Sequence, residues 1–548
     1  MNIIDQLVED GKQFFNEKKY PESIAVFRRL IEIAPDNDLA HFELGKIYLF
    51  ENKTAQAMEE LLKAVALNHA NTCARLLLAK LYKRAGRYAE AIEEFKKVKQ
   101  QGYAEENIEK EIADVYTLSG DFVQAHEFLS KALHHGYDSA QFAEDTHNLG
   151  LSQIRIIQEH NMNGRYLEAQ EAANRARGIV PREKIMLHNT ILNEIEIAQK
   201  KIYLDSKIRS LTVTLTNKCN LRCIMCEMRK TQWDLPAKTC REIIALLPSL
   251  ERVMWQGGEA FLFEGFEELL DESSRYPLRQ VLSTNGTLIT ERIAEKLVKY
   301  NVELTFSIDG ITKAVYEHIR PGAVFEEMLS KVALINDLRA RYNPKMSTRL
   351  NVLIMRSNVG QLCDFLDFAH RYKFTTVFFN ASGCDFKDVQ ENIFYFNFNA
   401  EIVASMNVLR KEVEAKAEAY GIRLENWLPT EKFFNEVQSP HAQLPPSSGS
   451  QGLHEPLQCN PLTRENSELF CHAPWQRLNI ACGGNVYPDC LCPETHSVGN
   501  VLEHSILEMW NGEKIQQLRR TISQGSCRGF CSNDCVCGRV PKMNLKYI

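Results

Sequence analysis

The chain has 548 residues, too many for one hydrophobic core, and this length predicts about three domains. Lys and Arg total 65 against 71 Asp and Glu, and the formal charge of -6 comes without a long basic run, so we expect no nucleic acid and no anionic membrane as partner. No stretch of about 18 uncharged apolar residues occurs, and the start is acidic rather than signal-like, which predicts a soluble cytoplasmic protein.

The first part of the chain repeats with a period of 34 residues. Small residues recur at one phase and larger apolar residues at another, namely Gly11, Gly45, Ala79 and Ala113, and then Phe27, Leu61, Phe95 and Leu129. Small residues let two antiparallel helices cross closely, and large ones fill the seam between neighbouring hairpins. The pattern resembles tetratricopeptide (TPR) repeats, with four copies over residues 5–138 and a fifth, after a ten-residue insertion, at 166–181.

This resemblance implies an all-α TPR solenoid over residues 1–182, and a connecting helix is predicted over 183–204. Solenoids of this kind have a concave groove, so we expect a peptide or protein partner there. A spacer or an oligomerisation surface is the alternative role for such an array.

From residue 205 onward, short β-branched runs alternate with amphipathic helical patterns. Strands are predicted at 210–216, 252–256, 279–284, 302–308, 348–355 and 375–380, and helices at 238–249, 263–275, 289–300, 324–342, 359–372 and 398–420. This alternation is typical of a parallel sheet, whose ligands gather at the carboxyl ends of the strands. We expect an α/β partial (β/α)6 barrel, TIM-like, over 205–436, then a linker or loop rich in Pro, Ser and Gly over 437–458.

The sixteen cysteines are distributed unevenly. Three lie between Cys219 and Cys226 and nine lie within 459–548, and such close spacing in a reducing compartment favours metal or iron–sulfur binding over disulfides. Three others lie in apolar helical patterns and are expected to be inert packing groups, namely Cys73, Cys240 and Cys363.

The motif Cys219-x3-Cys223-x2-Cys226 directly follows the first predicted strand. Three thiolates in one loop suit three corners of a cubic [4Fe–4S] cluster and leave one iron open, whereas a zinc site would need a distant fourth ligand. The motif resembles that of the radical S-adenosylmethionine (SAM) superfamily, which implies a SAM-binding [4Fe–4S] cluster. In that family SAM occupies the open iron, and its one-electron cleavage gives a 5′-deoxyadenosyl radical that takes a hydrogen atom from the substrate.

The ends of the following strands carry residues that are similar to family segments around SAM. Gly257 and Gly258 permit a close backbone approach to a ligand, and Glu259 is suited to accept a hydrogen bond from the SAM ammonium. The resemblance implies further contacts to the ribose, carboxylate and adenine of SAM from Met225, Ser283, Asn285, Ser307, Asp309 and Arg320, with Asn358 as another polar contact. Taken singly, the polar segments 283–286 and 307–310 would be ordinary turns. For Arg320, the alternative is an exposed arginine without a role.

The C-terminal cysteines resemble the SPASM and Twitch extensions of radical SAM enzymes, which implies one or two auxiliary [4Fe–4S] clusters. Cys471 and Cys490 match the first two ligands of that pattern, although the terminal spacing departs from it. We expect one cluster on Cys471, Cys490, Cys531 and Cys535, and a second would recruit Cys527, Cys537 and two of Cys459, Cys482 and Cys492. Structural zinc held by four thiolates is the alternative.

Cys384 and Asp385 follow the sixth predicted strand and would face the same end of the barrel as the cysteine loop, the end where the strands have their carboxyl ends. They are candidates for a hydrogen-atom or proton role, with a buried thiol without a task as the alternative. The chain is thus expected to be a radical SAM enzyme that modifies a peptide or protein-tethered group recruited by the TPR array, with flavodoxin or ferredoxin as electron donor. The rival hypotheses are a radical SAM enzyme acting on a sugar or nucleoside, and a non-catalytic iron–sulfur electron-transfer or scaffold protein.

Overall fold

The computed structural model describes residues 3–103, 107–177, 180, 184–226, 232–380, 391, 400–426, 471–489, 492 and 496–524. The chain divides into two compact units, Met1–Glu194 and Ile195–Ile548, and each has its own hydrophobic core. None of the helices within the described ranges combines the length and the apolar character that crossing a bilayer requires.

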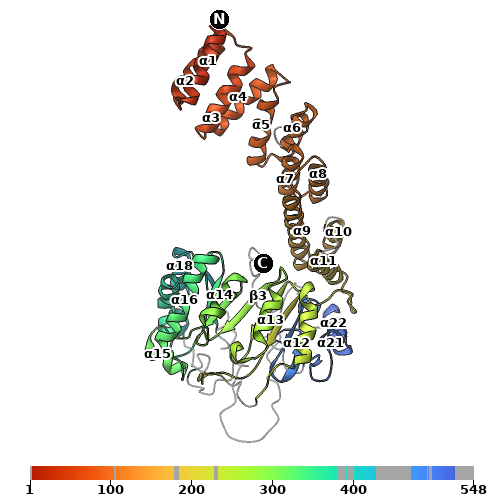
Figure 1. Ribbon diagram of the computed structural model, residues 1–548, viewed down its shortest axis with the longest axis vertical. Helices are drawn as coiled ribbons and strands as arrows, with labels where there is room; N and C mark the ends of the chain where they lie inside the picture. The colour runs from red at the N-terminus through yellow and green to blue at the C-terminus, as the bar shows by residue number, and fades with distance from the viewer. Residues whose placement is uncertain are drawn as a thin grey trace. The chain divides into compact units, whose positions relative to one another are not determined.

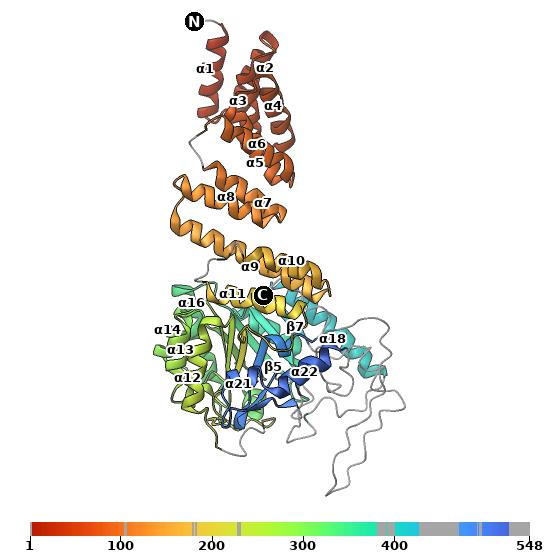
Figure 2. The same cartoon turned by 90° about the vertical axis from the view of Figure 1, so that its right-hand side faces the viewer.

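Unit 1 is a series of antiparallel helical hairpins (Figure 2), which confirms the TPR-like repeats. Its helices are α1 (Ile3–Asn16), α2 (Tyr20–Ile33), α3 (Asp38–Phe50), α4 (Thr54–Leu67), α5 (Thr72–Arg84), α6 (Tyr88–Gln100), α7 (Ile108–Ser119), α8 (Phe122–His134), α9 (Ser139–Met162) and α10 (Tyr166–Arg177). The helix α9 is 24 residues long, and this extra length absorbs the insertion before the fifth repeat. The helix α11 (Ile185–Ala198), predicted as a connection, carries the boundary between the two units.

The 34-residue period is explained by packing inside each hairpin. The Phe27 ring lies over Gly11 so closely that a Cβ there would come within 2.6 Å of it, and Leu61 lies over Gly45 in the same way, at 2.7 Å. The Ser23 hydroxyl donates to the Gly11 carbonyl at 2.7 Å. The large residues of the repeat therefore pack against the small ones of their own hairpin, whereas the sequence had assigned them to the seam between hairpins.

Unit 2 is built on a sheet whose order among the described residues is β10-β9-β8-β1-β2-β3-β4-β5-β6-β7. Strands β1 to β7 are parallel, and helices connect them. In chain order the elements are β1 (Ser210–Thr214), α12 (Ala237–Leu246), β2 (Arg252–Gln256), α13 (Phe266–Ser273), β3 (Arg279–Thr284), α14 (Glu291–Lys299), β4 (Glu303–Ser307), α15 (Lys313–Ile319), α16 (Phe325–Tyr342), β5 (Thr348–Leu353), α17 (Leu362–Arg371), β6 (Thr376–Asn380), α18 (Ala400–Ala419) and β7 (Arg423–Asn426). The six predicted strands are present, and β7 and α15 are additional.

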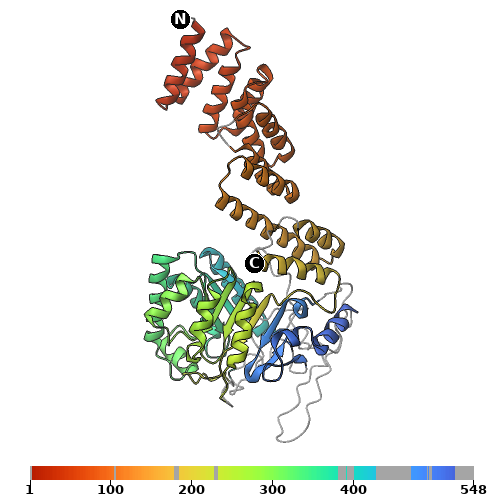
Figure 3. The same ribbon diagram turned by 45° about the vertical axis from the view of Figure 1, so that its right-hand side comes forward.

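The cysteine-rich end of the chain contributes strands to this same sheet. The strand β8 (Arg477–Ile480) pairs in parallel with β1 on the side opposite β2, so that Ile480 lies opposite Val213. The strands β9 (Asn485–Tyr487) and β10 (Gly499–Asn500) extend the sheet in antiparallel pairs. Figure 3 shows these strands, in blue, continuing the sheet. A backbone ladder therefore joins the C-terminal segment to the parallel strands.

The C-terminal helices are anchored to the segment that leads into β1. They are α20 (Ala473–Gln476), α21 (Ile506–Trp510) and α22 (Glu513–Ser523), and Figure 1 shows α21 and α22 beside α12. Trp475 and Trp510 are buried, and their indole N–H groups donate at 2.8 Å to the carbonyls of Lys201 and Ser206. The buried Arg519 donates at 2.9 Å to three more carbonyls, those of Ile202, Pro474 and Trp510.

Candidate functional site

The cysteine loop, residues 219–226, lies beyond the carboxyl end of β1, and its three cysteines are half-buried. Two main-chain hydrogen bonds fix it to the end of α15 and the residues that follow. The Arg222 N–H donates to the Pro321 carbonyl at 2.9 Å, and the Ile224 N–H donates to the Ile319 carbonyl at 3.0 Å. These contacts with the protein main chain give the loop a defined path.

A small apolar cluster supports the middle of the loop. Ile224 and Met225 are half-buried and pack against Ile319 and Met355, which are fully buried. Met225 thus contacts the protein interior on one side. Its predicted contact with the SAM adenine stays a prediction.

Gly257 and Gly258 bring the end of β2 against the backbone that leads into the cysteine loop. The Gly258 N–H donates to the Thr216 carbonyl at 2.7 Å, and a Cβ on Gly258 would lie 2.2 Å from the Lys218 carbonyl oxygen. Gly257 has a φ of 155°, and a Cβ there would lie 2.4 Å from the Thr216 oxygen. The close approach seen in the structure is to protein backbone, and the predicted approach to a ligand stays a prediction.

Glu259 ties the end of β2 to the end of β3. Its side chain is buried, with Oε1 accepting from the Thr284 hydroxyl at 2.7 Å and Oε2 accepting from the Asn285 N–H at 2.9 Å. Burial raises the pKa of this carboxyl, and the two hydrogen bonds oppose that rise without cancelling it. The predicted contact between Glu259 and the SAM ammonium stays a prediction beside this bracing role.

We expect Glu259→Gln to remove a pH dependence of stability. Because the folded-state pKa of Glu259 is raised above its ordinary value of 4.5, folding favours the protonated form, and the free energy of unfolding falls as pH rises from 4.5 through the folded-state pKa. The loss is about 1.4 kcal/mol for each unit of pKa difference, and a neutral amide escapes it. The free energy of unfolding of the variant, relative to that of wild type, should therefore rise with pH across this window.

Urea unfolding followed by tryptophan fluorescence measures this effect, since all five tryptophans lie in unit 2. The exposed carboxylate of Glu264 provides the control variant, Glu264→Gln. Parallel stability curves for wild type and Glu259→Gln between pH 4.5 and 7 would contradict the expectation.

The end of β3 touches the first cysteine. The Asn285 Nδ2 group donates to the Cys219 Sγ at 3.8 Å and to the Asn220 Oδ1 at 3.0 Å. Ser283 and Ser307 are half-buried at the carboxyl ends of β3 and β4. The structure therefore brings the predicted polar groups to the strand ends that face the loop, and their contacts with SAM stay predictions.

Asp309 and Arg320 form a buried ion pair beside the second cysteine. Arg320 donates from Nη2 to Asp309 Oδ2 at 2.6 Å and from Nη1 to Cys223 Sγ at 3.6 Å. Burial lowers the pKa of Arg320, but Asp309, Cys223 and Tyr316 together raise it by more, so the guanidinium stays cationic. Arg320 is thus a buried, oriented cation rather than the exposed arginine that the sequence left open.

Asn358 is used inside the protein. Its Nδ2 group donates to the main-chain carbonyls of Asp309 and Leu353 at 2.9 and 2.8 Å, and its Oδ1 accepts from the Met355 N–H at 2.8 Å. Both donor hydrogens are therefore occupied within the protein, and the expected polar contact from Asn358 to SAM stays a prediction.

Two residues near the loop escaped the sequence reasoning. Tyr316 is fully buried, its hydroxyl has no hydrogen-bond partner among the described residues, and burial raises its pKa to about 12. The Asn217 N–H donates to the Trp233 carbonyl at 3.1 Å, and the Trp233 N–H donates to Asn217 Oδ1 at 2.8 Å. The Asn217 side chain also hydrogen-bonds to the Cys482 thiol. The signal for Tyr316 was its place four residues before Arg320, because that spacing puts both on one helix face.

The loop and its surroundings fit a [4Fe–4S] cluster. Within the described ranges no three His, Cys, Asp or Glu side chains converge on one metal ion, and a cubic cluster needs no such convergence because each thiolate binds a different iron. Arg320 also has a buried Nε without a partner among the described residues. This Nε–H group belongs to a cationic side chain beside the cysteine sulfurs, so it suits a hydrogen bond to an anionic cluster or to a ligand carboxylate.

Several predicted positions lie outside the described residues, namely Cys384, Asp385, Cys459, Cys490, Cys527, Cys531, Cys535 and Cys537. In the C-terminal segment, Cys471, Cys482 and Cys492 are described and half-buried. The expectation that Cys73 packs in the interior is wrong, because its side chain is exposed on α5.

Known families match three parts of the chain. Residues 213–369 match the radical SAM superfamily, residues 471–536 match the SPASM iron–sulfur cluster-binding domain, and TPR repeats match at 11–49, 39–71 and 74–100. Mycofactocin maturase MftC of Mycobacterium ulcerans is 32% identical over 168 residues, which are 30% of this chain and 44% of MftC. GTP 3',8-cyclase of Synechocystis sp. is 29% identical over 196 residues, which are 33% of this chain and 58% of the cyclase.

The chain therefore spans less than half of the length of the mycofactocin maturase. Among solved structures, Streptococcus suis SuiB bound to S-adenosylmethionine is similar at 17% identity and a TM-score of 0.44, over 63% of this chain and 76% of SuiB. The family matches run in the same order as the parts of the fold. The chain carries a radical SAM superfamily domain, with TPR repeats before it and a SPASM domain after it.

Proposed function

We propose that this protein is a radical SAM enzyme that cleaves SAM reductively and removes a hydrogen atom from a peptide or protein-tethered group recruited by the TPR array. The observation that carries the proposal is the cysteine loop itself. Three half-buried thiols lie on one fixed loop at the carboxyl end of a parallel strand, with a buried cation directed at Cys223. Such an arrangement ligates three irons of a cubane and leaves one for a cofactor.

A radical SAM domain implies a SAM-binding [4Fe–4S] cluster, and a SPASM domain implies auxiliary clusters. With SAM bound, such a cluster supplies one-electron cleavage of the sulfonium to methionine and a 5′-deoxyadenosyl radical. The cysteines of residues 219–226 would hold it, and the Asn285 amide and the Arg320 guanidinium would donate to their sulfurs. Cys471 is our first candidate ligand for an auxiliary cluster.

The test is anaerobic reconstitution of the full chain with iron and sulfide, followed by assay for 5′-deoxyadenosine with SAM and dithionite. We expect bound iron and formation of 5′-deoxyadenosine. A preparation that retains zinc and yields no 5′-deoxyadenosine would overturn the proposal.

A groove on unit 1 supports recruitment of a peptide. It has a volume of about 320 Å³ and is lined mainly from α3 and α5, by Phe42, Lys46, Leu49, Phe50, Leu77 and Lys80 among others. Phe50 is 62% exposed, so the groove presents apolar surface to solvent. Exposed apolar and aromatic side chains with lysines beside them suit an extended or helical peptide that carries both apolar and acidic residues.

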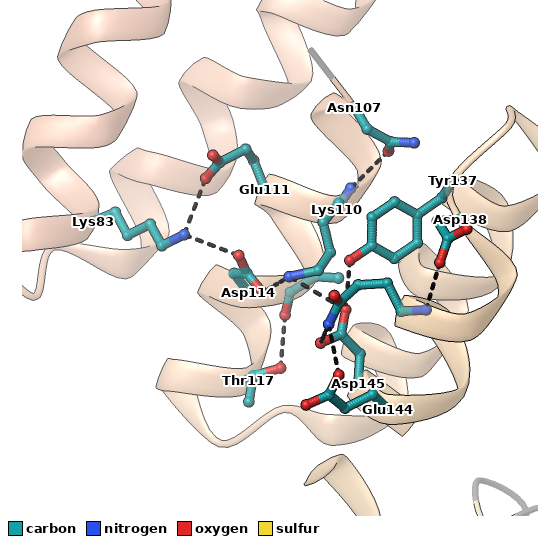
Figure 4. A network of polar contacts seen from close by, with 12 residues as sticks. Lys83, Asn107, Lys110, Glu111, Asp114, Thr117, Tyr137, Asp138, Glu144 and Asp145 are labelled. Atoms are coloured by element: carbon teal, nitrogen blue, oxygen red, sulfur yellow. Dashed lines mark hydrogen bonds and ion pairs between the residues drawn. The ribbon is translucent and has the colours of Figure 1, made fainter. Parts of the chain in front are cut away.

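Beyond this groove, ion pairs connect the first helices of successive hairpins (Figure 4). The Lys83 ammonium on α5 pairs with Glu111 and Asp114 on α7, at 3.0 and 3.2 Å. The Lys110 ammonium on α7 pairs with Asp114 at 2.6 Å and with Asp145 on α9 at 3.5 Å. These ion pairs link α5, which also lines the groove, to the first helices of the next two hairpins. Such links favour a preformed binding surface over one that forms only when a peptide binds.

We expect Leu77→Asp to impair peptide modification while leaving peptide-independent SAM cleavage unchanged. Leu77 is half-buried in the groove, and a carboxylate there would be desolvated by a bound apolar side chain at a cost of about 2 kcal/mol, or roughly thirtyfold in KM. The measurement is product formation against peptide concentration, using peptides encoded by neighbouring genes. The control is Leu62→Asp, at an exposed leucine on α4. Equal KM values for the two variants would argue against recruitment through this groove.

A small-molecule substrate is the second candidate, and the similarity to GTP 3',8-cyclase favours it. In that case the TPR array would serve assembly. Removal of residues 1–180 distinguishes the two proposals, because it should abolish modification of a peptide and leave turnover of a small molecule intact.

A further inference from the structure

The ion pair between Asp309 and Arg320, beside the cysteine loop, is buried and held by further hydrogen bonds. Asp309 is 1% exposed and Arg320 is 7% exposed. The Asp309 carboxylate accepts from the Leu353 N–H at 2.8 Å through Oδ1 and from Arg320 at 2.6 Å through Oδ2. Its main-chain carbonyl accepts from the buried Asn358 at 2.9 Å. The last residue of β5 therefore holds this carboxylate, and through it the guanidinium, in one orientation, while Asn358 fixes the main chain of Asp309.

That orientation directs a positive charge at one cysteine. Arg320 Nη1 lies 3.6 Å from the Cys223 sulfur, and the hydroxyl of the neighbouring Tyr316 has no partner among the described residues. The surroundings are poor in water, because Tyr316 is fully buried and Ile319 and Met355 pack beside the loop. Charges interact more strongly in such surroundings than at an exposed surface. The guanidinium and the carboxylate should both be felt at the sulfur, with opposite signs.

We propose that Asp309 and Arg320 are positioning residues that set the reduction potential of the cluster bound through Cys223. One-electron reduction adds one negative charge to the cluster, so the guanidinium favours it and the carboxylate disfavours it. The two effects on the reduction potential largely cancel. A small net effect in favour of reduction remains, because the guanidinium is the partner in contact with the Cys223 sulfur. This inference rests on the proposed function, since it requires a cluster on residues 219–226.

The two charges make predictions of opposite sign. Arg320→Gln removes the cation and leaves Asp309 uncompensated, so the potential should shift to more negative values. Asp309→Asn removes the anion and leaves the guanidinium, so the potential should shift to more positive values. The double variant restores charge balance and should lie between the two single variants, close to wild type. A merely structural role would move both single variants in the same direction or in neither.

The experiment is a redox titration of the anaerobically reconstituted full chain without SAM, using dithionite as the one-electron reductant and electron paramagnetic resonance as the readout. The signal to follow is the one that is lost in Cys223→Ala. Arg339→Gln is the matched control, because Arg339 is also an arginine that is 7% exposed, yet it bonds to Asn336, Thr348 and Lys373 near the amino end of β5. Iron is counted in every variant.

The control should retain the wild-type potential. Shifts of Arg320→Gln and Asp309→Asn in the same direction, or no shift in either with iron retained, would overturn the inference and leave the proposed function standing. A wild-type chain without a signal that depends on Cys223 would overturn the proposed function itself. The two failures are therefore distinguishable in one set of titrations.

Discussion

Replacing Cys223 with alanine should reduce formation of 5′-deoxyadenosine from SAM by about a hundredfold or more, a loss of roughly 2.7 kcal/mol of transition-state stabilisation. Cys223 is the middle one of the three proposed ligands and the one that Arg320 contacts. With two thiolates left in the loop, a cubane would lack a protein ligand on a second iron. The variant should also lose the iron that belongs to this site, and both quantities are measured on the same anaerobic preparation.

Cys240→Ala is the control for this experiment. Cys240 is also half-buried in unit 2, but it lies on α12, outside the loop. Its replacement should leave iron content and SAM cleavage near wild type. Full retention of both iron and 5′-deoxyadenosine formation in Cys223→Ala would refute the assignment of the cluster to this loop.

Gly258→Ala should destabilise unit 2 by about 3 kcal/mol and lower the iron content of the first site. The added Cβ would lie 2.2 Å from the Lys218 oxygen and 2.8 Å from the Asn217 carbonyl carbon, and both are backbone atoms that cannot rotate away. Relief of the clash must therefore move the backbone just before Cys219. Urea unfolding followed by tryptophan fluorescence measures the stability, and iron analysis measures the effect on the site.

The matched control is Gly360→Ala, because a Cβ at Gly360 would meet nothing within 4 Å. This change should alter the free energy of unfolding by less than about 0.5 kcal/mol. If both alanine variants unfold alike, the glycine at 258 is not required for the close approach of β2 to the loop.

The parts of the fold that were predictable are those in which local pattern and packing coincide. The TPR period was visible because Gly11 and Phe27 meet inside one hairpin, so each repeat carries its own contacts in a short stretch of sequence. The strands β1 to β6 were visible for a similar reason, since each is a short β-branched run next to an amphipathic helix. The cysteine loop was visible because its three cysteines all lie within residues 219–226.

The pairing of β8 with β1 had no such signal. Ser210 lies opposite Arg477, and nothing in the short run 477–480 distinguishes a partner of β1 from a strand of a separate module. Strand pairing between distant segments depends on which edge remains open after the local elements have formed, and periodicity does not encode that.

The candidate site shows the same limit. The sequence placed Glu259 and Asp309 at strand ends and singled out Arg320, but it did not show which partners they have within the protein. Glu259 accepts from the end of β3, and Arg320 is held by Asp309 against a cysteine sulfur. Such buried contacts depend on side-chain directions across neighbouring strands, which become known only with the three-dimensional arrangement.

The place of β8 in the sheet also affects how the protein is made. About 260 residues separate the end of β1 from the start of β8, and the ribosome adds residues at roughly 5–20 per second, so the outer edge of β1 stays bare for roughly 13–50 seconds during synthesis. An unpaired strand edge invites pairing with other chains. Nascent copies on one messenger RNA are therefore exposed to mispairing until the last part of the chain emerges, and slow translation or low temperature should increase their dependence on chaperones.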